Sequence, residues 1–469
     1  MRKSAEAGSA GDIATPRIVS TETLLWLLGT VIAGAIAGYA VSRGTTLAVG
    51  LLGIAAAGLI LWRFEIGTVL MVVTLPLDMY GRVLSSGSVT ITAFHVMLGL
   101  TLVSWAVALA WRVDAKVRFS IVDIGMALLV LAAVWSLPFS LDRRDTIVAI
   151  IRLAFLWAFV LLYANAMSSR RVFGWVASAL MVTGAASSAF ALAQYFLPDF
   201  DYGNVIQVRQ GGVVMRRVGA LFDDPNYFAG FASLAFIVAL GYLLHARRSR
   251  VVAPLLGCCA LCGGAVLVTF SRTGWVGVAV GAVVLVMTAP PKRRLWLVIL
   301  GGVLVAAVFA ARPEAIIERI ASIGDVGGDN SIGTRYYMVG SSVEMIRDYW
   351  TFGTGLSAYD VAFPAYRAAG TLSGVIRPHQ LPLALWAEMG MAGIIAEVVL
   401  VWTLVRTFVR RRLASWTVAE SFAAAGLVSL LVQSLFQYYL YFDYLWLFVA
   451  FAIAANRLAA RDEETDRVN

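Results

Sequence analysis

Long apolar stretches alternate with short polar connections along almost the whole chain. A helix that crosses a bilayer needs about 20 mostly apolar residues, and the chain contains fourteen runs of roughly this kind. We place them at about residues 23–42, 46–62, 66–80, 91–111, 121–139, 146–167, 172–197, 226–245, 251–270, 274–290, 294–311, 381–408, 416–438 and 441–458. The third run is short and contains Pro76, so it is the least regular of the predicted spans. The pattern predicts a polytopic protein built from transmembrane helices.

The basic residues alternate between successive connections. If the N-terminus lies in the cytoplasm, every inner connection carries at least one Lys or Arg, and the inner segments hold 22 of the 37 basic residues. Cytoplasmic connections are enriched in these residues, so the alternation predicts an even number of spans with both termini inside. Fourteen spans fit it, and so do twelve spans with two re-entrant or interfacial segments. Arg152 is the one basic residue within a predicted span, and the pattern gives it no role.

The composition agrees with a membrane protein. Of the 469 residues, 60% are hydrophobic and 14% are charged, whereas a soluble domain is about 25% charged. The net charge of +9 does not indicate nucleic-acid binding, because the basic residues form short clusters between apolar runs. Cys258, Cys259 and Cys262 share one apolar run, and we interpret them as small residues of a lipid-embedded helix rather than as a redox or metal site. The first 20 residues lack a cleavable signal of the usual form, so the run from Leu24 is expected to act as an uncleaved anchor.

We therefore expect an all-α polytopic membrane protein with 12–14 transmembrane helices and one large outer loop that contains short helices. The expected regions are about seven N-terminal helices in residues 1–197, central helices with an outer segment and a Ser-Arg turn in 198–311, the outer loop in 312–380, and C-terminal helices with a cytoplasmic tail in 381–469.

The large outer loop divides further. Residues 313–323 carry Ile at helical spacing, which predicts an interfacial helix. Residues 324–331 are rich in Gly and Asp and are expected to form a connection. A second helix is predicted over 334–350, and it leads into the Gly-containing turn at 352–355.

All fourteen basic residues predicted on the outer side are arginines. Arg217 precedes the eighth span, Arg272 lies in a tight turn between two spans, and Arg335 and Arg377 lie in the large loop. A guanidinium group binds phosphate oxygens bidentately and keeps its charge when partly desolvated. Arginines that converge from these segments at the bilayer surface would suit a lipid-anchored pyrophosphate. The alternative is that they pair with outer carboxylates or contact lipid headgroups.

His379 is the histidine predicted on the outer side, since His95 falls within a span and His245 lies beside an inner basic cluster. An imidazole that titrates near neutral pH can act as a general base, for example toward a sugar hydroxyl; the alternative is a structural histidine. The sequence contains no HExxH, Walker A or Gly-rich dinucleotide motif and no outer Asp-x-Asp pair. Arginine rather than a metal ion is therefore expected to neutralise the pyrophosphate.

Three stretches together resemble the O-antigen ligase and polymerase superfamily of bacterial inner-membrane glycosyltransferases, which are of the GT-C type. They are RVGALFDDPNYFAG at 217–230, TFSRTGWVG at 269–277, and the outer loop with Arg335, YWTFGTGLSAY at 349–359, and His379-Gln380 followed by LPLALWAEMGMAG at 381–393. Two positions depart from the family pattern. Gln380 stands where asparagine is commoner, and Asp224 stands where asparagine is frequent.

The resemblance implies an inverting, metal-independent glycosyl transfer without a cofactor, on the periplasmic (outer) face of the bacterial inner membrane. The donor would be a glycan on undecaprenyl pyrophosphate, and the acceptor a hydroxyl of a glycan or glycolipid such as lipid A–core. By analogy, Arg217, Arg272 and Arg335 would bind the pyrophosphate and His379 would deprotonate the acceptor. Candidates for supporting roles are Arg377, Gln380 and Glu388, of which Glu388 is expected to cap a helix.

Several alternatives remain open in the sequence. A ligase passes the glycan to lipid A–core or another acceptor, whereas a polymerase passes it to a lipid-linked repeat. A transporter or flippase of polyprenyl-linked glycans is less favoured, because its functional charges should lie midway through spans. A peptidoglycan glycosyltransferase of the shape–elongation–division type would need a catalytic outer acid in a different motif. Outer aromatic residues would stack on sugars or belong to the interfacial aromatic belt; they are Tyr336, Tyr337, Tyr349, Trp350, Tyr359 and Tyr366.

Overall fold

A computed structural model of the chain describes most of the residues after the first predicted span. The described residues are 46–77, 82–86, 89–111, 116–197, 199–200, 202–210, 213–246, 249–291, 293–295, 301–302, 330–367, 379–409 and 412–468. The predicted span at 23–42, almost all of that at 294–311, and the predicted interfacial helix at 313–323 lie outside them.

Apolar helices dominate the described residues, and this confirms the all-α polytopic prediction. Eight helices there are long and apolar enough to cross a membrane, and four shorter helices are also apolar. The eight are α4 (Ala93–Trp111), α5 (Val122–Ser136) with the 3₁₀ turn that follows it, α6 (Arg143–Ala166), α7 (Arg170–Phe196), α8 (Pro225–His245), α9 (Ser249–Val268), α15 (Leu381–Val409) and α17 (Asp443–Val468). The shorter ones are α2 (Thr46–Trp62), α3 (Phe64–Thr74), α10 (Arg272–Thr288) and α16 (Val418–Ser434). These twelve helices coincide with twelve of the fourteen predicted runs.

Local sequence signals set where several of these helices begin. Asp142 precedes α6 and accepts a hydrogen bond from the amide of Asp145. Thr417 and Glu420 form a reciprocal capping box at the start of α16. Such side chains satisfy amide groups that have no partner within the helix, so each helix starts at a residue that the sequence specifies.

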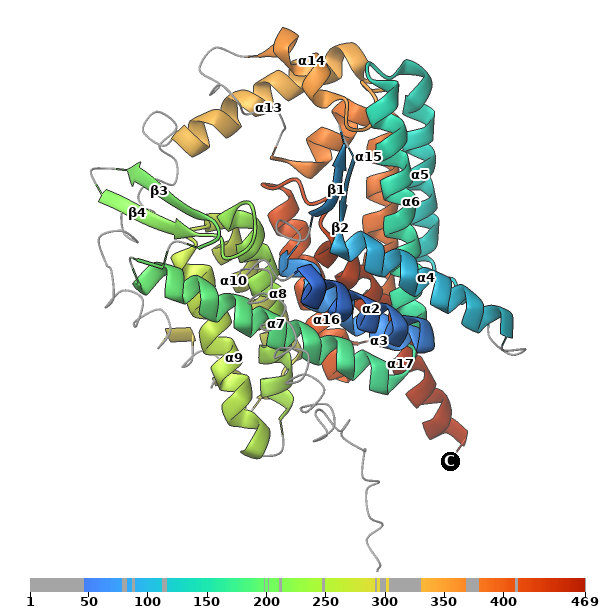
Figure 1. The fold of residues 1–469 in the computed structure, drawn as a ribbon, viewed down its shortest axis with the longest axis vertical. Helices are drawn as coiled ribbons and strands as arrows, with labels where there is room; N and C mark the ends of the chain where they lie inside the picture. The colour runs from blue at the N-terminus through green and yellow to red at the C-terminus, as the bar shows by residue number, and fades with distance from the viewer. Residues whose placement is uncertain are drawn as a thin grey trace, which may run out of the picture.

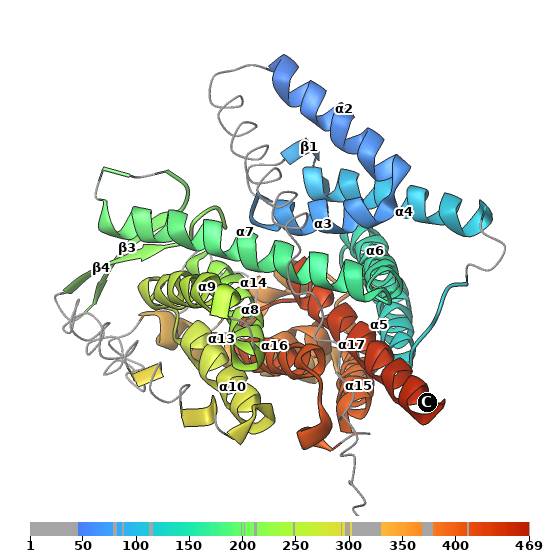
Figure 2. The same cartoon turned by 90° about the horizontal axis from the view of Figure 1, so that it is seen from below.

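The helices form two groups with α7 and α17 beside them. Helices α5, α6 and α15 run side by side, while α8, α9, α10 and α16 pack into a second group (Figure 1). Seen from below, α7 crosses the molecule toward α17, with α2, α3 and α4 on one side of it and α8, α10 and α16 on the other (Figure 2). Helix α8 is the most buried of the candidate spans: 89% of the residues in its most apolar stretch are buried. It is therefore a central element.

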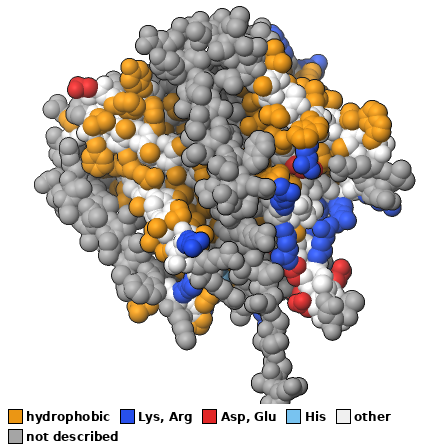
Figure 3. Space-filling view, turned by 60° about the horizontal axis from the view of Figure 1, so that its bottom comes forward, with side chains coloured by type: hydrophobic (Ala, Val, Ile, Leu, Met, Phe, Trp, Pro, Cys, Tyr) orange, Lys and Arg blue, Asp and Glu red, His pale blue; other side chains and the backbone are white. Residues whose placement is uncertain are grey.

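Much of the described surface is apolar, as expected for helices that face lipid. Hydrophobic side chains cover broad areas in the space-filling view (Figure 3). Leu131 and Trp135 on α5 and Ile151 on α6 are each more than half exposed. A water-soluble protein would leave few such contiguous patches.

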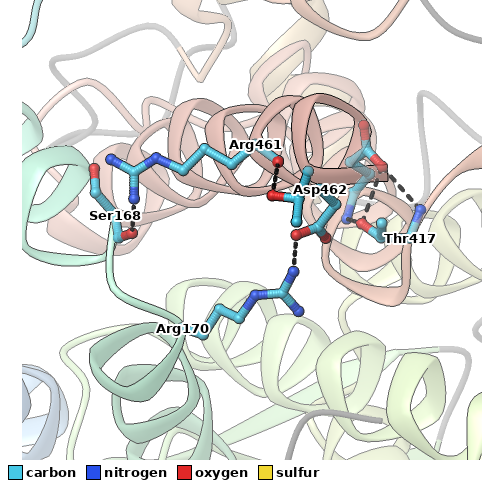
Figure 4. A network of polar contacts seen from close by, with 7 residues as sticks. Ser168, Arg170, Thr417, Arg461 and Asp462 are labelled. Atoms are coloured by element: carbon cyan, nitrogen blue, oxygen red, sulfur yellow. Dashed lines mark hydrogen bonds and ion pairs between the residues drawn. The ribbon is translucent and has the colours of Figure 1, made fainter. Parts of the chain in front are cut away.

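The segments predicted to be inner meet at one end of the helices. Arg457 of α17 donates to the carbonyls of Ala164 and Arg118. Arg461 donates to the carbonyl of Ser168, and Asp462 pairs with Arg170 (Figure 4). Except for Ala164, which lies near the end of α6, the partners in these contacts belong to predicted inner segments. These contacts gather three of the predicted inner segments at one end of the helices. The alternation of the other connections, and the side that faces the cytoplasm, stay predictions.

Among the described residues there are two β-hairpins, which the sequence patterns did not predict. Strands β1 (Arg82–Ser86) and β2 (Val89–Thr92) pair antiparallel between α3 and α4. Strands β3 (Val205–Gln210) and β4 (Val213–Val218) pair antiparallel in the expected outer segment, with Ile206 opposite Arg217. Strands this short carry too few alternating positions to stand out among long apolar runs.

The predicted second helix of the large loop is confirmed as α13 (Asn330–Tyr349). It begins slightly earlier than expected, because Asn330 and Ser331 are helical rather than part of the preceding connection. Helix α14 (Tyr359–Tyr366) follows, and both helices lie across the top of the molecule (Figure 1). Met338, Met345 and Phe363 pack against Ala387 of α15, so this part of the loop is anchored to a span.

Helix α15 is bent at Gly390, where φ is 62° and ψ is −153°. The turn at 350–355 fits into this bend: the amide of Gly355 donates to the carbonyl of Glu388, and the amide of Met391 to the carbonyl of Trp350. A Cβ on Gly390 would meet the backbone of Thr351. The turn and the bend therefore depend on glycine, which alone combines a positive φ with so close an approach.

Candidate functional site

The stretch 217–226 brings Arg217 against the start of α8. Asp224 is the N-cap of α8 and accepts from the amide of Asn226, and Pro225 occupies the first turn. The side chain of Arg217, on β4, donates through Nη2 to Oδ1 of Asn226 at 3.0 Å. It also donates through Nε to the carbonyl of Thr269 at 2.9 Å. One guanidinium thus ties the hairpin, the start of α8 and the turn between α9 and α10.

The Ser-Arg turn is held in a strained conformation. Phe270 has a φ of 51°, which is unusual for a bulky residue, and its ring packs with Met215 of β4. Ser271 caps α10 by accepting from the amide of Gly274. Arg272 is therefore the first residue of α10 rather than a turn residue, and its side chain is half-buried. Arg217 and Arg272 flank the same turn.

His379 lies just before α15 and is half-buried, and three other segments contribute its environment. Burial lowers the pKa of His379 below its ordinary value of 6.5, and the nearby positive charge of Arg335 lowers it further. The carboxylate of Asp224 and a side-chain hydrogen bond with Gln437 act in the opposite direction and raise the pKa. The net lowering leaves the imidazole neutral at pH 7, which is the state that accepts a proton.

The connection between α16 and α17, residues 435–442, forms a further wall of the site. Gln437 is 1% exposed, and within the described part of the chain its Nε2 has no hydrogen-bond partner. Tyr439 is buried, and its hydroxyl lies 3.3 Å from the carbonyl oxygen of Asn226 and 3.2 Å from Oε1 of Gln433, either of which can accept its single proton. This connection therefore joins His379 to the start of α8.

Glycines of two sequence motifs make room for this connection and for the end of α16. A Cβ on Gly230 would lie 2.7 Å from the hydroxyl of Tyr439, and a Cβ on Gly277 would overlap the side-chain amide of Gln433. A Cβ on Gly393 would meet the carbonyl of Leu385, across the bend of the same helix.

Arg152, which had no role in the sequence pattern, holds the same connection from α6. Its guanidinium lies 4.4 Å from the centroid of the Tyr441 ring and donates to the Tyr441 carbonyl at 3.3 Å. The Tyr441 hydroxyl in turn lies 3.2 Å from Oγ of Ser357, in the loop before α14. Arg152 thus holds the connection 435–442, which borders His379, and does not contact His379 itself.

The candidates for supporting roles differ in their placement. Glu388 is 2% exposed, and its carboxylate accepts from the hydroxyl of Tyr438 at 3.4 Å. A capping carboxylate lies in or just before the first turn of a helix, whereas Glu388 is the eighth residue of α15. The prediction that Glu388 caps this helix is therefore wrong. Gln380 adjoins His379, and in the described structure its Oε1 is buried without a hydrogen-bond partner. Arg377 lies outside the described residues.

The outer aromatic residues fall into two groups. Tyr336, Tyr337 and Trp350 are exposed, by 66%, 37% and 53%, and so remain open to a sugar or a membrane surface. Tyr359 is 1% exposed and its hydroxyl lies 2.8 Å from Oγ of Ser342, so it belongs to the core of the loop. Tyr366 donates to Asp348 at 2.6 Å, and its ring meets that of Tyr349 edge-on.

The structure thus brings together His379, Arg335 and the start of α8, and places Arg217 and Arg272 at the adjacent turn. Sequence reasoning missed Gln437 and Tyr439, and it did not connect Asp224 with His379. The run QYYLYFDY at 437–444 was a usable signal, because polar and tyrosine residues crowd there between two apolar helices. Chemically, the arrangement offers an imidazole with a lowered pKa beside the positive charge of Arg335.

Residues 257–398 match the family model for O-antigen ligase. Over this part of the chain the match confirms the resemblance to the O-antigen ligase and polymerase superfamily. The matched segment contains Arg272, Arg335, His379, Gln380 and Glu388, whereas Arg217 and Gln437 lie on either side of it. A comparison with curated proteins finds no match.

Proposed function

We propose that this protein is a glycosyltransferase that moves a glycan from undecaprenyl pyrophosphate to an acceptor hydroxyl, at the outer face of the bacterial inner membrane. The observation that carries the proposal is the convergence of Arg335, Asp224 and Gln437 on His379. The match to the O-antigen ligase family supports a ligase-like or polymerase-like activity; the donor, the acceptor and the roles of residues are our inference.

In the proposed step, the neutral imidazole of His379 takes the proton of the acceptor hydroxyl. The hydroxyl oxygen forms a bond to the anomeric carbon while the bond from that carbon to the pyrophosphate oxygen breaks. The electron pair leaves with the lipid pyrophosphate, and attack from the opposite side inverts the anomeric configuration. The pKa of His379 below 6.5 suits this role, because most of the imidazole is unprotonated at pH 7.

The leaving pyrophosphate gains negative charge as the bond breaks, and arginine would stabilise it. Preorganised positive charge at the place where charge develops lowers the barrier. Arg335 faces His379, and Arg217 is fixed by its hydrogen bonds to Asn226 and Thr269. With Arg272, these residues supply the charge that a divalent cation supplies in other enzymes, so transfer is expected to proceed in the presence of a chelator.

The direct test uses the purified full chain with a defined undecaprenyl-pyrophosphate glycan and two acceptors, one a lipid A–core glycolipid and the other a lipid-linked repeat. His379→Ala should lower product formation by at least about 100-fold, since general base catalysis contributes about 10²–10⁴-fold. An unchanged melting temperature would show that the variant is folded. Near-normal turnover by folded His379→Ala contradicts the mechanism.

The same assay separates the two activities that share this chemistry. Mass spectrometry of the product identifies glycan on the lipid A–core acceptor, as a ligase would form, or on the lipid-linked repeat, as a polymerase would form. Replacing Arg217, Arg272 or Arg335 by Gln should each weaken use of the donor. A strict requirement for a divalent cation would contradict the role given to these arginines.

A further inference from the structure

A polar pocket lies between α15 and α17, at the end of α15 away from His379. Its volume is about 340 Å³. Arg406 and Thr407 of α15 line it on one side and Ile453, Asn456 and Arg457 of α17 on another. Arg406 lies 16 residues beyond the bend of α15 at Gly390, which corresponds to about 24 Å of helix. The pocket is therefore separate from the proposed glycosyltransferase site.

The polar wall of the pocket is rich in positive charge. Arg457 donates to two backbone carbonyls, those of Ala164 and Arg118, which fixes its guanidinium in place without neutralising it. The charges of Arg118 and Arg461 act on the same guanidinium. Hydrogen bonds to carbonyls leave further N–H groups of Arg457 able to donate.

The one carboxylate that acts on Arg457 in the described structure is that of Asp123, and other donors engage it. Asp123 accepts from the amide and the hydroxyl of Ser120, at 2.5 and 2.9 Å. It also accepts from Nε1 of Trp157 at 2.9 Å. The positive charge of the pocket is therefore only partly compensated by the protein.

Arg406 provides a second cation at the rim. Its guanidinium lies 5.0 Å from the centroid of the Trp402 ring, and the side chains of both residues are exposed. Among the described residues no carboxylate lies within ion-pair distance of Arg406. A tryptophan and an arginine at the last turns of a spanning helix are typical of the level of the lipid headgroups. The pocket thus opens where a membrane presents phosphate.

Part of the remaining lining is apolar. Phe119, which is 66% exposed, and Ile453, which is buried, contribute to the wall beside the arginines. A free inorganic anion would gain nothing from these side chains, whereas an amphiphile would place its first methylene groups against them. The chemistry of the pocket therefore matches a phosphate that is attached to an acyl chain.

We propose that this pocket binds the phosphate of an anionic glycerophospholipid from the leaflet opposite the glycosyltransferase site. Arg406 and Arg457 hold the phosphate oxygens, and the acyl chains leave the pocket along Phe119. Bound lipid then bridges α15 and α17. His379 precedes the first residue of α15, and Gln437 lies in the connection that precedes α17. The proposal does not depend on the reaction at that site.

The test is native mass spectrometry of the detergent-purified full chain, titrated with phosphatidylglycerol, phosphatidylcholine or inorganic phosphate. Phosphatidylglycerol should remain bound in preference to phosphatidylcholine. Arg406→Gln should weaken phosphatidylglycerol binding about fivefold, the loss that corresponds to about 1 kcal/mol per basic side chain near an anionic lipid. Because Arg406 is exposed, the variant is expected to fold, which its melting temperature checks.

Arg63→Gln is the matched control, since Arg63 also stacks on a neighbouring tryptophan, 6.0 Å from the Trp62 ring, but does not line the pocket. This variant should bind phosphatidylglycerol like the unchanged chain, and Arg406→Lys should retain more binding than Arg406→Gln. Equal weakening by Arg63→Gln and Arg406→Gln would indicate only general surface charge and overturn the proposal. Equal binding of phosphatidylcholine, or displacement of the lipid by an equal concentration of inorganic phosphate, would overturn it as well.

Discussion

At the scale of single residues, the acid–base character of His379 results from neighbours that are distant in sequence. Arg335 and burial lower its pKa, while Asp224 and Gln437 raise it. Asp224 stands where the family frequently has asparagine, so this chain adds a negative charge beside the proposed base. Asp224 also caps α8, and asparagine caps a helix about as well as aspartate does. Its charge can therefore be removed without removing its structural contact.

Replacing Asp224 by Asn should move the acid limb of the pH–rate profile to lower pH. The carboxylate raises the pKa of His379, so its removal lowers that pKa, and the imidazole then stays unprotonated to more acidic pH. The measurement is the initial rate of glycan transfer as a function of pH, with the melting temperature as a control for folding. A shift to higher pH would show that Asp224 does not act on His379 in this way.

Gln437→Glu provides the contrasting variant. A negative charge at the position that hydrogen-bonds His379 should raise the pKa of the imidazole and move the acid limb to higher pH. Opposite shifts from the two variants would identify His379 as the titrating group. If Gln437 only supported the fold, the profile would keep its shape while stability fell.

At the scale of elements, the bend of α15 places His379 and the outer loop relative to one another. Gly390 adopts a positive φ, and the turn at 350–355 donates to and accepts from the backbone on both sides of the bend. The backbone conformation therefore requires glycine at position 390. The carboxylate of Glu388, by contrast, accepts a hydrogen bond from Tyr438, which lies in the same connection as Gln437.

Gly390→Ala should destabilise the protein and lower its activity. The positive φ alone costs a non-glycine residue about 1–3 kcal/mol, and the added Cβ would meet the backbone of Thr351. Thermal unfolding in detergent, followed together with glycan transfer, measures both effects.

Gly340→Ala is the matched control, because Gly340 lies within helix α13 and a Cβ there would meet nothing within 4 Å. Alanine is the better helix former by about 0.5–1 kcal/mol, so this variant should be as stable as the unchanged chain or more stable. Equal melting temperatures for the two variants would show that the bend is not fixed by Gly390.

At the scale of the whole molecule, the connections separate into two ends. Arginine contacts such as those of Arg457 and Arg461 join the predicted inner segments, and the site gathers the predicted outer ones. The positive-inside rule predicts that the arginine-contact end faces the cytoplasm.

Cysteine labelling tests this orientation. In a chain whose three native cysteines are replaced by alanine, Tyr202→Cys should react with a membrane-impermeant maleimide in spheroplasts, because Tyr202 is 70% exposed at the predicted outer end. Ala460→Cys, at an exposed position on α17, should react only after the membrane is permeabilised. The reverse pattern would invert the topology and place the proposed site in the cytoplasm.

The sequence alone predicted the helices and where they meet polar connections. Backbone groups in lipid must be hydrogen-bonded within the helix, and apolar side chains are unfavourable in water. Both requirements apply to each segment separately, so apolar runs, helix caps and basic residues mark the spans in the sequence. The motifs containing Arg217, Arg272 and His379 were found in the same way, because each is a short continuous stretch.

Only the tertiary structure decided which residues meet. The neighbours of His379 come from the start of α8, from α13 and from the connection between α16 and α17, and no local pattern records such distances. Arg152 shows the same limit, since its partner Tyr441 is 289 residues away in the chain. Packing of helices in three dimensions, which depends on close approach at residues such as Gly230 and Gly277, set the electrostatics of the site.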